Sequence, residues 1–142
     1  MPLQRVCEVL FPLLRPGARV VNLSSAAGWV GGLTAGFGDF VDTGDQDRAQ
    51  QLVSVLTAPD LTVETLDNVV RQYEKDAESG VEAIKAAGWV SSPYFASKMF
   101  WSALSRIQQR EMKTGDDVVV NHVHPGYVAT DMTDHKGVRT TE

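Results

Sequence analysis

Residues 94–98 read Tyr-Phe-Ala-Ser-Lys, which places a tyrosine and a lysine four positions apart. Apolar residues recur around them at helical spacing, so we predict a helix from Tyr94 to Lys113. On a helix, residues four apart lie on one face, one turn from each other. An ammonium group beside a phenol stabilises the phenolate, and such a tyrosine can exchange a proton with a substrate oxygen. Taken alone, this spacing is also common between exposed residues and has low specificity.

A short β-branched run lies on each side of this helix in the sequence. Residues 19–24 read Arg-Val-Val-Asn-Leu-Ser and residues 118–123 read Val-Val-Val-Asn-His-Val, and we predict both as buried strands. Serines follow the first strand, and Pro125-Gly126 follows the second. Ligands bind at the carboxyl ends of the strands in open α/β sheets. The serines, the Tyr-x-x-x-Lys pair and the Pro-Gly pair are therefore expected to meet at one edge of a sheet.

The remaining segments alternate with these strands. The first segment is an amphipathic helix that ends at Pro16-Gly17. Residues 25–38 are glycine-rich and are predicted as a loop. A second amphipathic helix begins after its N-cap, Thr62, and ends at Ser79-Gly80. The order helix, strand, insertion, helix, strand predicts an α/β fold with a parallel sheet. Two strands do not complete such a sheet. We therefore expect residues 1–142 to form the later part of a larger α/β domain.

Composition excludes several classes of protein. The chain has 43% hydrophobic residues and a net charge of −5, so a broad nucleic-acid surface is not expected. Residues 39–82 hold 11 acidic and 3 basic residues, which marks an acidic insertion in a mildly basic body. Cys7 is the only cysteine, which excludes an internal disulfide. His122 and His124 have no Cys or carboxylate at ligand spacing, so no metal site is expected. No apolar run is long enough for a membrane span, and we expect a soluble, cytoplasmic protein.

The serine motif, the Tyr-x-x-x-Lys pair and the Pro-Gly motif, in this order and on these elements, resemble the short-chain dehydrogenase/reductase family. The resemblance runs over nearly the whole chain and implies part of a doubly wound Rossmann fold. The long segment between serine and tyrosine, with an insertion at about residues 39–87, resembles the helical insertion of monomeric NADPH-dependent carbonyl reductases. Residues 88–94, Gly-Trp-Val-Ser-Ser-Pro-Tyr, resemble that subgroup as well.

The resemblance implies a role for individual residues. Ser25, rather than Ser24, matches the serine that holds the substrate carbonyl, Tyr94 matches the general acid, and Lys98 matches the residue that tunes it and binds the nicotinamide ribose. The segment that lines the nicotinamide is matched by Pro125, Gly126, Val128 and Thr130. Trp29 and Trp89 flank the serine and tyrosine motifs, and for both we weigh lining of the substrate mouth equally against ordinary packing.

The cofactor-phosphate half of the family's pattern is missing. The chain has no G-x-G-x-x-G loop, no Thr-Gly-x-x-x-Gly-x-Gly turn and no Asn-Asn-Ala-Gly strand. The resemblance implies NADPH as cofactor, by analogy with carbonyl reductases, and leaves NAD open.

The function implied is reduction of ketones, aldehydes or quinones by an oxidoreductase that is monomeric when complete. Its partner would be a small-molecule carbonyl substrate, with no nucleic acid and no membrane. One alternative is a catalytically inactive truncated product that lacks the cofactor-phosphate half. Another is an epimerase or dehydratase on the same scaffold, which the carbonyl-reductase-like insertion disfavours.

Overall fold

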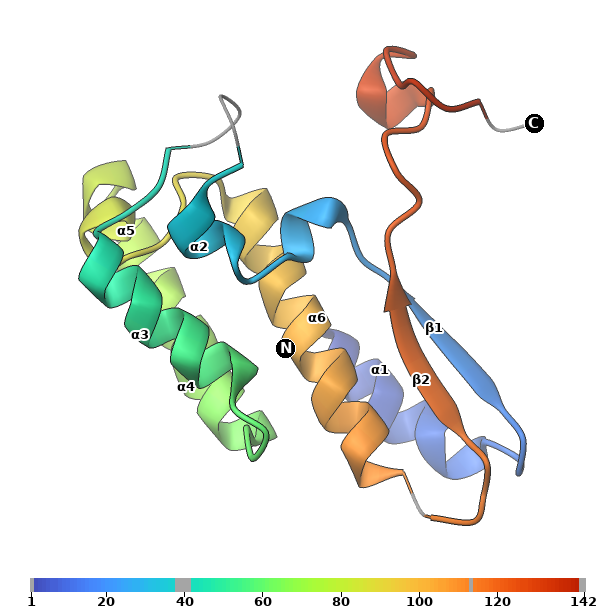
Figure 1. The fold of residues 1–142 in the computed structure, drawn as a ribbon. Helices are drawn as coiled ribbons and strands as arrows, with labels where there is room; N and C mark the ends of the chain where they lie inside the picture. Colours follow the sequence, from blue (N-terminus) through green and yellow to red (C-terminus); the bar gives the residue numbers. More distant parts are fainter. Residues whose placement is uncertain (1, 38–41, 113, 141–142) are drawn as a thin grey trace.

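The computed structural model describes residues 2–37, 42–112 and 114–140 (Figure 1). Its sheet has two strands, β1 (Arg19–Leu23) and β2 (Val119–Val123), which run parallel. Their register pairs Arg19 with Val119 and Leu23 with Val123. The expected α/β fold with a parallel sheet is confirmed, and in the described residues the sheet has only these two strands.

The long helix α6 (Pro93–Glu111) packs against one face of this sheet. Proline is suited to the first turn of a helix, where its missing N–H has no helical partner to lose. The predicted helix began one residue later and extended to Lys113, which lies outside the described residues. The helix runs opposite to the strands, so its N-terminal turn lies at their carboxyl end (Figure 1).

Three helices of the inserted segment lie beside α6, on the side away from the strands: α3 (Gln46–Thr57), α4 (Val63–Glu78) and α5 (Val81–Ala86) (Figure 1). The Thr62 hydroxyl accepts a hydrogen bond from the Thr65 amide at 3.1 Å, which confirms the predicted N-cap of α4. Asp45 caps α3 in the same way, through the Arg48 amide at 3.0 Å.

The hydrophobic core lies between these helices and α6 rather than under the sheet. Tyr73, Trp89 and Phe100 form an edge-to-face aromatic cluster with ring centroids 5.2–5.7 Å apart. Aromatic pairs favour such edge-to-face geometry. Fully buried aliphatic side chains surround the cluster: Leu33, Leu56, Leu66, Val90, Met99, Leu104 and Ile107.

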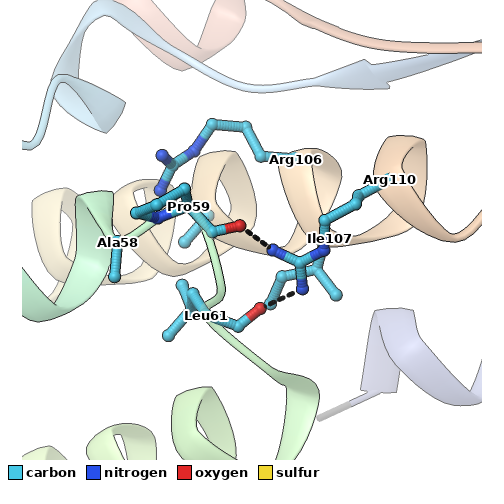
Figure 2. A pocket seen from close by; sticks show the side chains of 7 residues that line it. Ala58, Pro59, Leu61, Arg106, Ile107 and Arg110 are labelled. Carbon is cyan, nitrogen blue, oxygen red and sulfur yellow. Dashed lines mark hydrogen bonds between the residues drawn. The ribbon is translucent and has the colours of Figure 1, made fainter.

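Two arginines of α6 attach the loop between α3 and α4 to this core. Arg106 donates a hydrogen bond to the carbonyl of Leu56, in the last turn of α3. Arg110 donates to the carbonyls of Pro59 and Leu61, and Figure 2 shows its guanidinium between them. The arginines lie beside a small cavity of about 180 Å³. The Leu56 carbonyl lies in the last turn of α3, where carbonyls lack helical partners, and Pro59 and Leu61 lie in the loop that follows, so the two guanidiniums supply donors to carbonyls outside the regular helix bonds.

The prediction that both strands are buried is wrong. In β1 the side chain of Asn22 is buried toward α6, whereas Val21 and Leu23 are 61% and 60% exposed. In β2 only Val120 is buried. Side chains alternate between the faces of a strand, and within the described residues only the face toward α6 is covered. The sequence run alone did not reveal that the second face lacks a covering layer.

The amino-terminal segment differs in a similar way. It forms α1 (Pro2–Leu10) and a 3₁₀ turn, η1 (Phe11–Leu13), as its spacing predicts. Yet Val9 is 68% and Leu13 is 73% exposed, and among residues 4–13, whose burial is described, only Cys7 is buried. The apolar stripe of this helix is therefore largely open to solvent in the described structure.

The segment predicted as a loop over residues 25–38 is also partly helical, and this prediction is wrong. A 3₁₀ turn, η2 (Ala26–Gly28), follows the strand, and a one-turn helix, α2 (Gly32–Ala35), follows it. Gly28 lies so close to α6 that an added Cβ would be 2.5 Å from the Ser102 hydroxyl and 2.8 Å from the Lys98 carbonyl. Glycine here permits close contact between the serine motif and the tyrosine helix.

Candidate active site

The serine motif and α6 are joined at the carboxyl end of β1, and the Pro-Gly segment begins at the carboxyl end of the neighbouring strand β2. The serine motif follows β1, the first turn of α6 carries Tyr94, and the Pro-Gly segment follows β2 (Figure 1). Direct bonds join the first two: the Lys98 ammonium donates to the Leu23 carbonyl at 3.4 Å, and the Ser24 hydroxyl lies 3.5 Å from the Lys98 carbonyl.

The two serines occupy different environments. Ser24 is 5% exposed, and its hydroxyl lies 3.1 Å from that of Ser102 on α6. Ser25 is half-buried and begins η2, where its Oγ accepts a hydrogen bond from the Ala27 amide at 3.2 Å. The Ser25 hydroxyl proton remains available for a further acceptor. Ser24 is therefore engaged in packing, whereas Ser25 can contact a ligand.

Tyr94 and Lys98 lie one turn apart on α6. Tyr94 is 46% exposed. The Lys98 Nζ atom lies 5.7 Å from the centroid of the Tyr94 ring and 5.8 Å from that of Trp101. Among the described residues no direct hydrogen bond joins the Tyr94 hydroxyl to Ser25 Oγ. That a substrate oxygen is held between these two hydroxyls stays a prediction.

The Pro-Gly segment forms a compact turn beyond β2. Gly126 has a φ of +85°, which glycine adopts without steric cost. Val128 pairs with Arg139 in an isolated parallel bridge, and the Val128 carbonyl accepts a hydrogen bond from Thr133 Oγ1 at 2.6 Å. Thr130 caps the following 3₁₀ turn, η3 (Asp131–Thr133). These bonds fix the backbone of Val128 and Thr130, which the family resemblance assigns to the lining of the nicotinamide.

A buried polar network joins β1 to α6 just before the serine motif, and the sequence alone did not predict it. The Asn22 amide donates to Ser105 Oγ at 2.8 Å and to Gln108 Oε1 at 3.0 Å. Burial raises the pKa of the nearby Cys7 thiol, while a hydrogen bond with Gln108 opposes this shift. An asparagine inside an apolar strand run was the available signal, because a buried amide requires partners.

The largest opening beside the serine motif is a cavity of about 770 Å³. Ser25, Trp29, Arg106 and His122 are among the residues that line it. Of the two tryptophans considered from sequence, Trp29 is 58% exposed and lines this cavity, whereas Trp89 is only 2% exposed and belongs to the core. Desolvation, and then the charge of Arg106, lower the pKa of His122.

None of the helices in the described part of the chain combines the length and hydrophobicity needed to cross a bilayer. In the same residues, no group of three or more His, Cys, Asp or Glu side chains is placed to hold a metal ion.

Comparison with known proteins identifies the relatives of this chain. No family model matches it. Carbonyl reductase (NADPH) 1 from Sus scrofa is 32% identical over 145 residues, which cover 100% of this chain and 45% of that protein. The human protein of the same name is 31% identical over 140 residues, with 96% and 45% covered. The chain thus spans less than half the length of these curated relatives.

A solved structure agrees with the sequence comparison. Salutaridine reductase from Papaver somniferum superposes with a TM-score of 0.73 at 29% identity, covering 97% of this chain and 42% of that one. The resemblance to short-chain dehydrogenases/reductases is thereby confirmed, and the two-stranded sheet corresponds to part of their Rossmann fold. These relatives are named as reductases, that is, as enzymes.

Proposed function

We propose that residues 1–142 are the carboxyl-terminal portion of a single short-chain dehydrogenase/reductase domain that reduces carbonyl compounds with NADPH. The inserted segment, about residues 39–87, forms the helical layer beside α6. The substrates are ketones, aldehydes or quinones, and the complete protein acts as a cytoplasmic monomer. The observation that carries this proposal is the hydrogen bond from Lys98 to the last residue of β1, which places the Tyr94–Lys98 helix beside the serine motif at the carboxyl end of a parallel sheet, in a chain similar to NADPH carbonyl reductases.

The residues present fit the nicotinamide and ribose half of the cofactor. Within the described part of the chain the Lys98 ammonium has one hydrogen-bond acceptor, the Leu23 carbonyl, and an ammonium has three donors. Two remain for ribose hydroxyls. Pro125, Gly126, Val128 and Thr130 would line the nicotinamide, which supplies the hydride when bound. The sequence holds no glycine-rich loop for the phosphates, so those contacts must come from outside residues 1–142. NAD is the alternative cofactor.

In the proposed reaction this chain's side chains handle the substrate oxygen. Ser25 donates a hydrogen bond to the carbonyl and stabilises the negative charge that develops on its oxygen. Tyr94 donates its hydroxyl proton to that oxygen. The positive charge of Lys98, one turn away, stabilises the phenolate that remains.

A second candidate is a catalytically inactive truncated product. The exposed faces of β1 and α1 favour it, because apolar residues such as Val9, Leu13, Val21 and Leu23 lack the cover that a complete domain would provide. On this view residues 1–142 occur without a cofactor-phosphate half.

Purification of the full protein, meaning the longest polypeptide that the gene encodes around residues 1–142, separates the candidates. We expect the full protein to bind NADPH and to oxidise it only when a quinone or aldehyde is present. A full protein that consists of residues 1–142 alone and oxidises no NADPH would favour the inactive product. Cofactor binding without reduction of any ketone, aldehyde or quinone would overturn the carbonyl reductase assignment.

A further inference from the structure

The cavity beside Ser25 is lined by both basic and apolar side chains. Arg106, His122 and His124 contribute its basic groups, and no acidic side chain of the described residues lines it. Trp29 and Val123 contribute apolar surface. Ser25, which we assign to the substrate carbonyl, lines this cavity, whereas Tyr94 and Lys98 lie outside its lining.

Among the residues that the structure describes, Arg106 has no acidic side chain as an ion-pair partner. None of the ion pairs between described residues includes Arg106 or Arg110, which lie one turn apart on α6. Desolvation, and then repulsion from Arg110, lower the pKa of the Arg106 guanidinium. The guanidinium still stays charged at physiological pH. Only the bond to the Leu56 carbonyl engages Arg106 in the described structure, and a guanidinium has five donors.

The chemistry that complements this arrangement is a carboxylate on an apolar body. Guanidinium and carboxylate pair through two parallel hydrogen bonds, and such charge-assisted bonds are among the strongest in proteins. An aromatic or aliphatic body would contact Trp29 and Val123, and a carbonyl group would lie on the side of the cavity that Ser25 lines. We propose that this cavity binds carbonyl substrates that carry a carboxylate and that Arg106 pairs with the carboxylate, an inference that rests on the proposed carbonyl reductase function.

Arg110 provides a matched control on the same helix. Both arginines hold the α3–α4 loop through backbone carbonyls, but Arg110 lines only the small cavity of Figure 2 and not the cavity beside Ser25. Loss of the loop attachment should therefore affect both variants, and loss of carboxylate recognition should affect only Arg106.

The test compares 4-carboxybenzaldehyde with 4-formylbenzamide, which has the same ring and aldehyde but no charge. Reduction of each by NADPH is measured with the full protein and with Arg106→Met, Arg106→Lys and Arg110→Met, and calorimetry measures binding without NADPH. We expect the unmodified protein to prefer the carboxylate by roughly tenfold or more in kcat/KM and in affinity. Arg106→Met should abolish the preference, Arg106→Lys should retain part of it, and Arg110→Met should leave it unchanged.

Three outcomes would overturn the inference: no preference in the unmodified protein, an unchanged preference in Arg106→Met, or an equal loss in Arg110→Met. The comparison in the unmodified protein requires no substitution and decides the matter if a variant does not fold. If neither aldehyde is reduced, the proposed reductase function fails, while calorimetry still tests the carboxylate site.

Discussion

The Nζ atom of Lys98 lies 5.7 Å from the centre of the Tyr94 ring and donates to the carbonyl of Leu23, the last residue of β1. One side chain thus connects the tyrosine helix with the strand that leads to the serine motif. Because the same ammonium is assigned to the ribose and to the tyrosine, its loss should have two separable effects.

Lys98→Ala in the full protein should weaken NADPH binding and lower turnover together. Loss of a charge-assisted hydrogen bond to the ribose is expected to raise the Kd about tenfold or more. Turnover falls further because the phenolate loses its neighbouring cation. Cofactor fluorescence measures the first effect and steady-state kinetics the second. Lys75→Ala, at an exposed position on α4, is the control and should change neither. A variant with normal cofactor affinity would remove Lys98 from the ribose site.

The two serines should separate into a catalytic and a structural residue. Ser25→Ala removes the proposed donor to the substrate oxygen and should reduce kcat by on the order of 10²-fold. Ser24→Ala breaks the contact with Ser102 and should lower the free energy of unfolding by about 1 kcal/mol, with little change in kcat. Denaturant unfolding and kinetics of both variants decide this. If Ser24→Ala showed the larger loss of kcat, the two assignments would have to be exchanged.

Asn22 should be important for stability although it is not assigned to the reaction. Asn22→Ala leaves the buried oxygens of Ser105 and Gln108 without their donor, and we expect unfolding to become easier by about 1–3 kcal/mol. Asn121→Ala, at an exposed position on β2, removes the same group from the neighbouring strand and should cost much less. Urea midpoints of the two variants measure the difference. Equal midpoints would show that the network contributes little.

The isolated chain of residues 1–142 should be poorly soluble or molten and should show no appreciable NADPH-dependent carbonyl reduction. Two strands with one uncovered face and an α1 helix with an exposed apolar stripe favour aggregation. Near-UV circular dichroism and NADPH oxidation with a quinone or aldehyde check this. A sharp cooperative melt with measurable turnover would contradict it.

Local signals predicted some elements and not others. The N-cap Thr62 and the apolar spacing of α4 indicate the same helix, so that helix was predicted close to its observed bounds. Helix α3 begins with a polar run, and α5 has only six residues, so both depend on burial of Leu56 and Ile84 in the core more than on their own sequence. Burial of the strands depends on a covering layer, which no pattern within the strand reveals.

The same distinction applies to the site. Helical spacing correctly predicted that Tyr94 and Lys98 lie one turn apart on α6, and the strand pattern correctly placed the serine motif after β1. The attachment of Arg106 to the Leu56 carbonyl, 50 residues away in the chain, has no local signal, because an arginine on a helix surface usually contacts water. Only the folded structure shows that Arg106 lines the cavity beside Ser25.

The central claim is that Tyr94 donates the proton in carbonyl reduction, and Tyr94→Phe in the full protein tests it most directly. This change removes the hydroxyl and keeps the ring beside Lys98. Tyr73→Phe, which removes a buried hydroxyl within the aromatic cluster, is the matched control. We predict that kcat for a quinone or aldehyde falls by on the order of 10²-fold or more in Tyr94→Phe, with NADPH affinity nearly unchanged, whereas Tyr73→Phe keeps its turnover. Near-normal turnover in Tyr94→Phe would contradict the account.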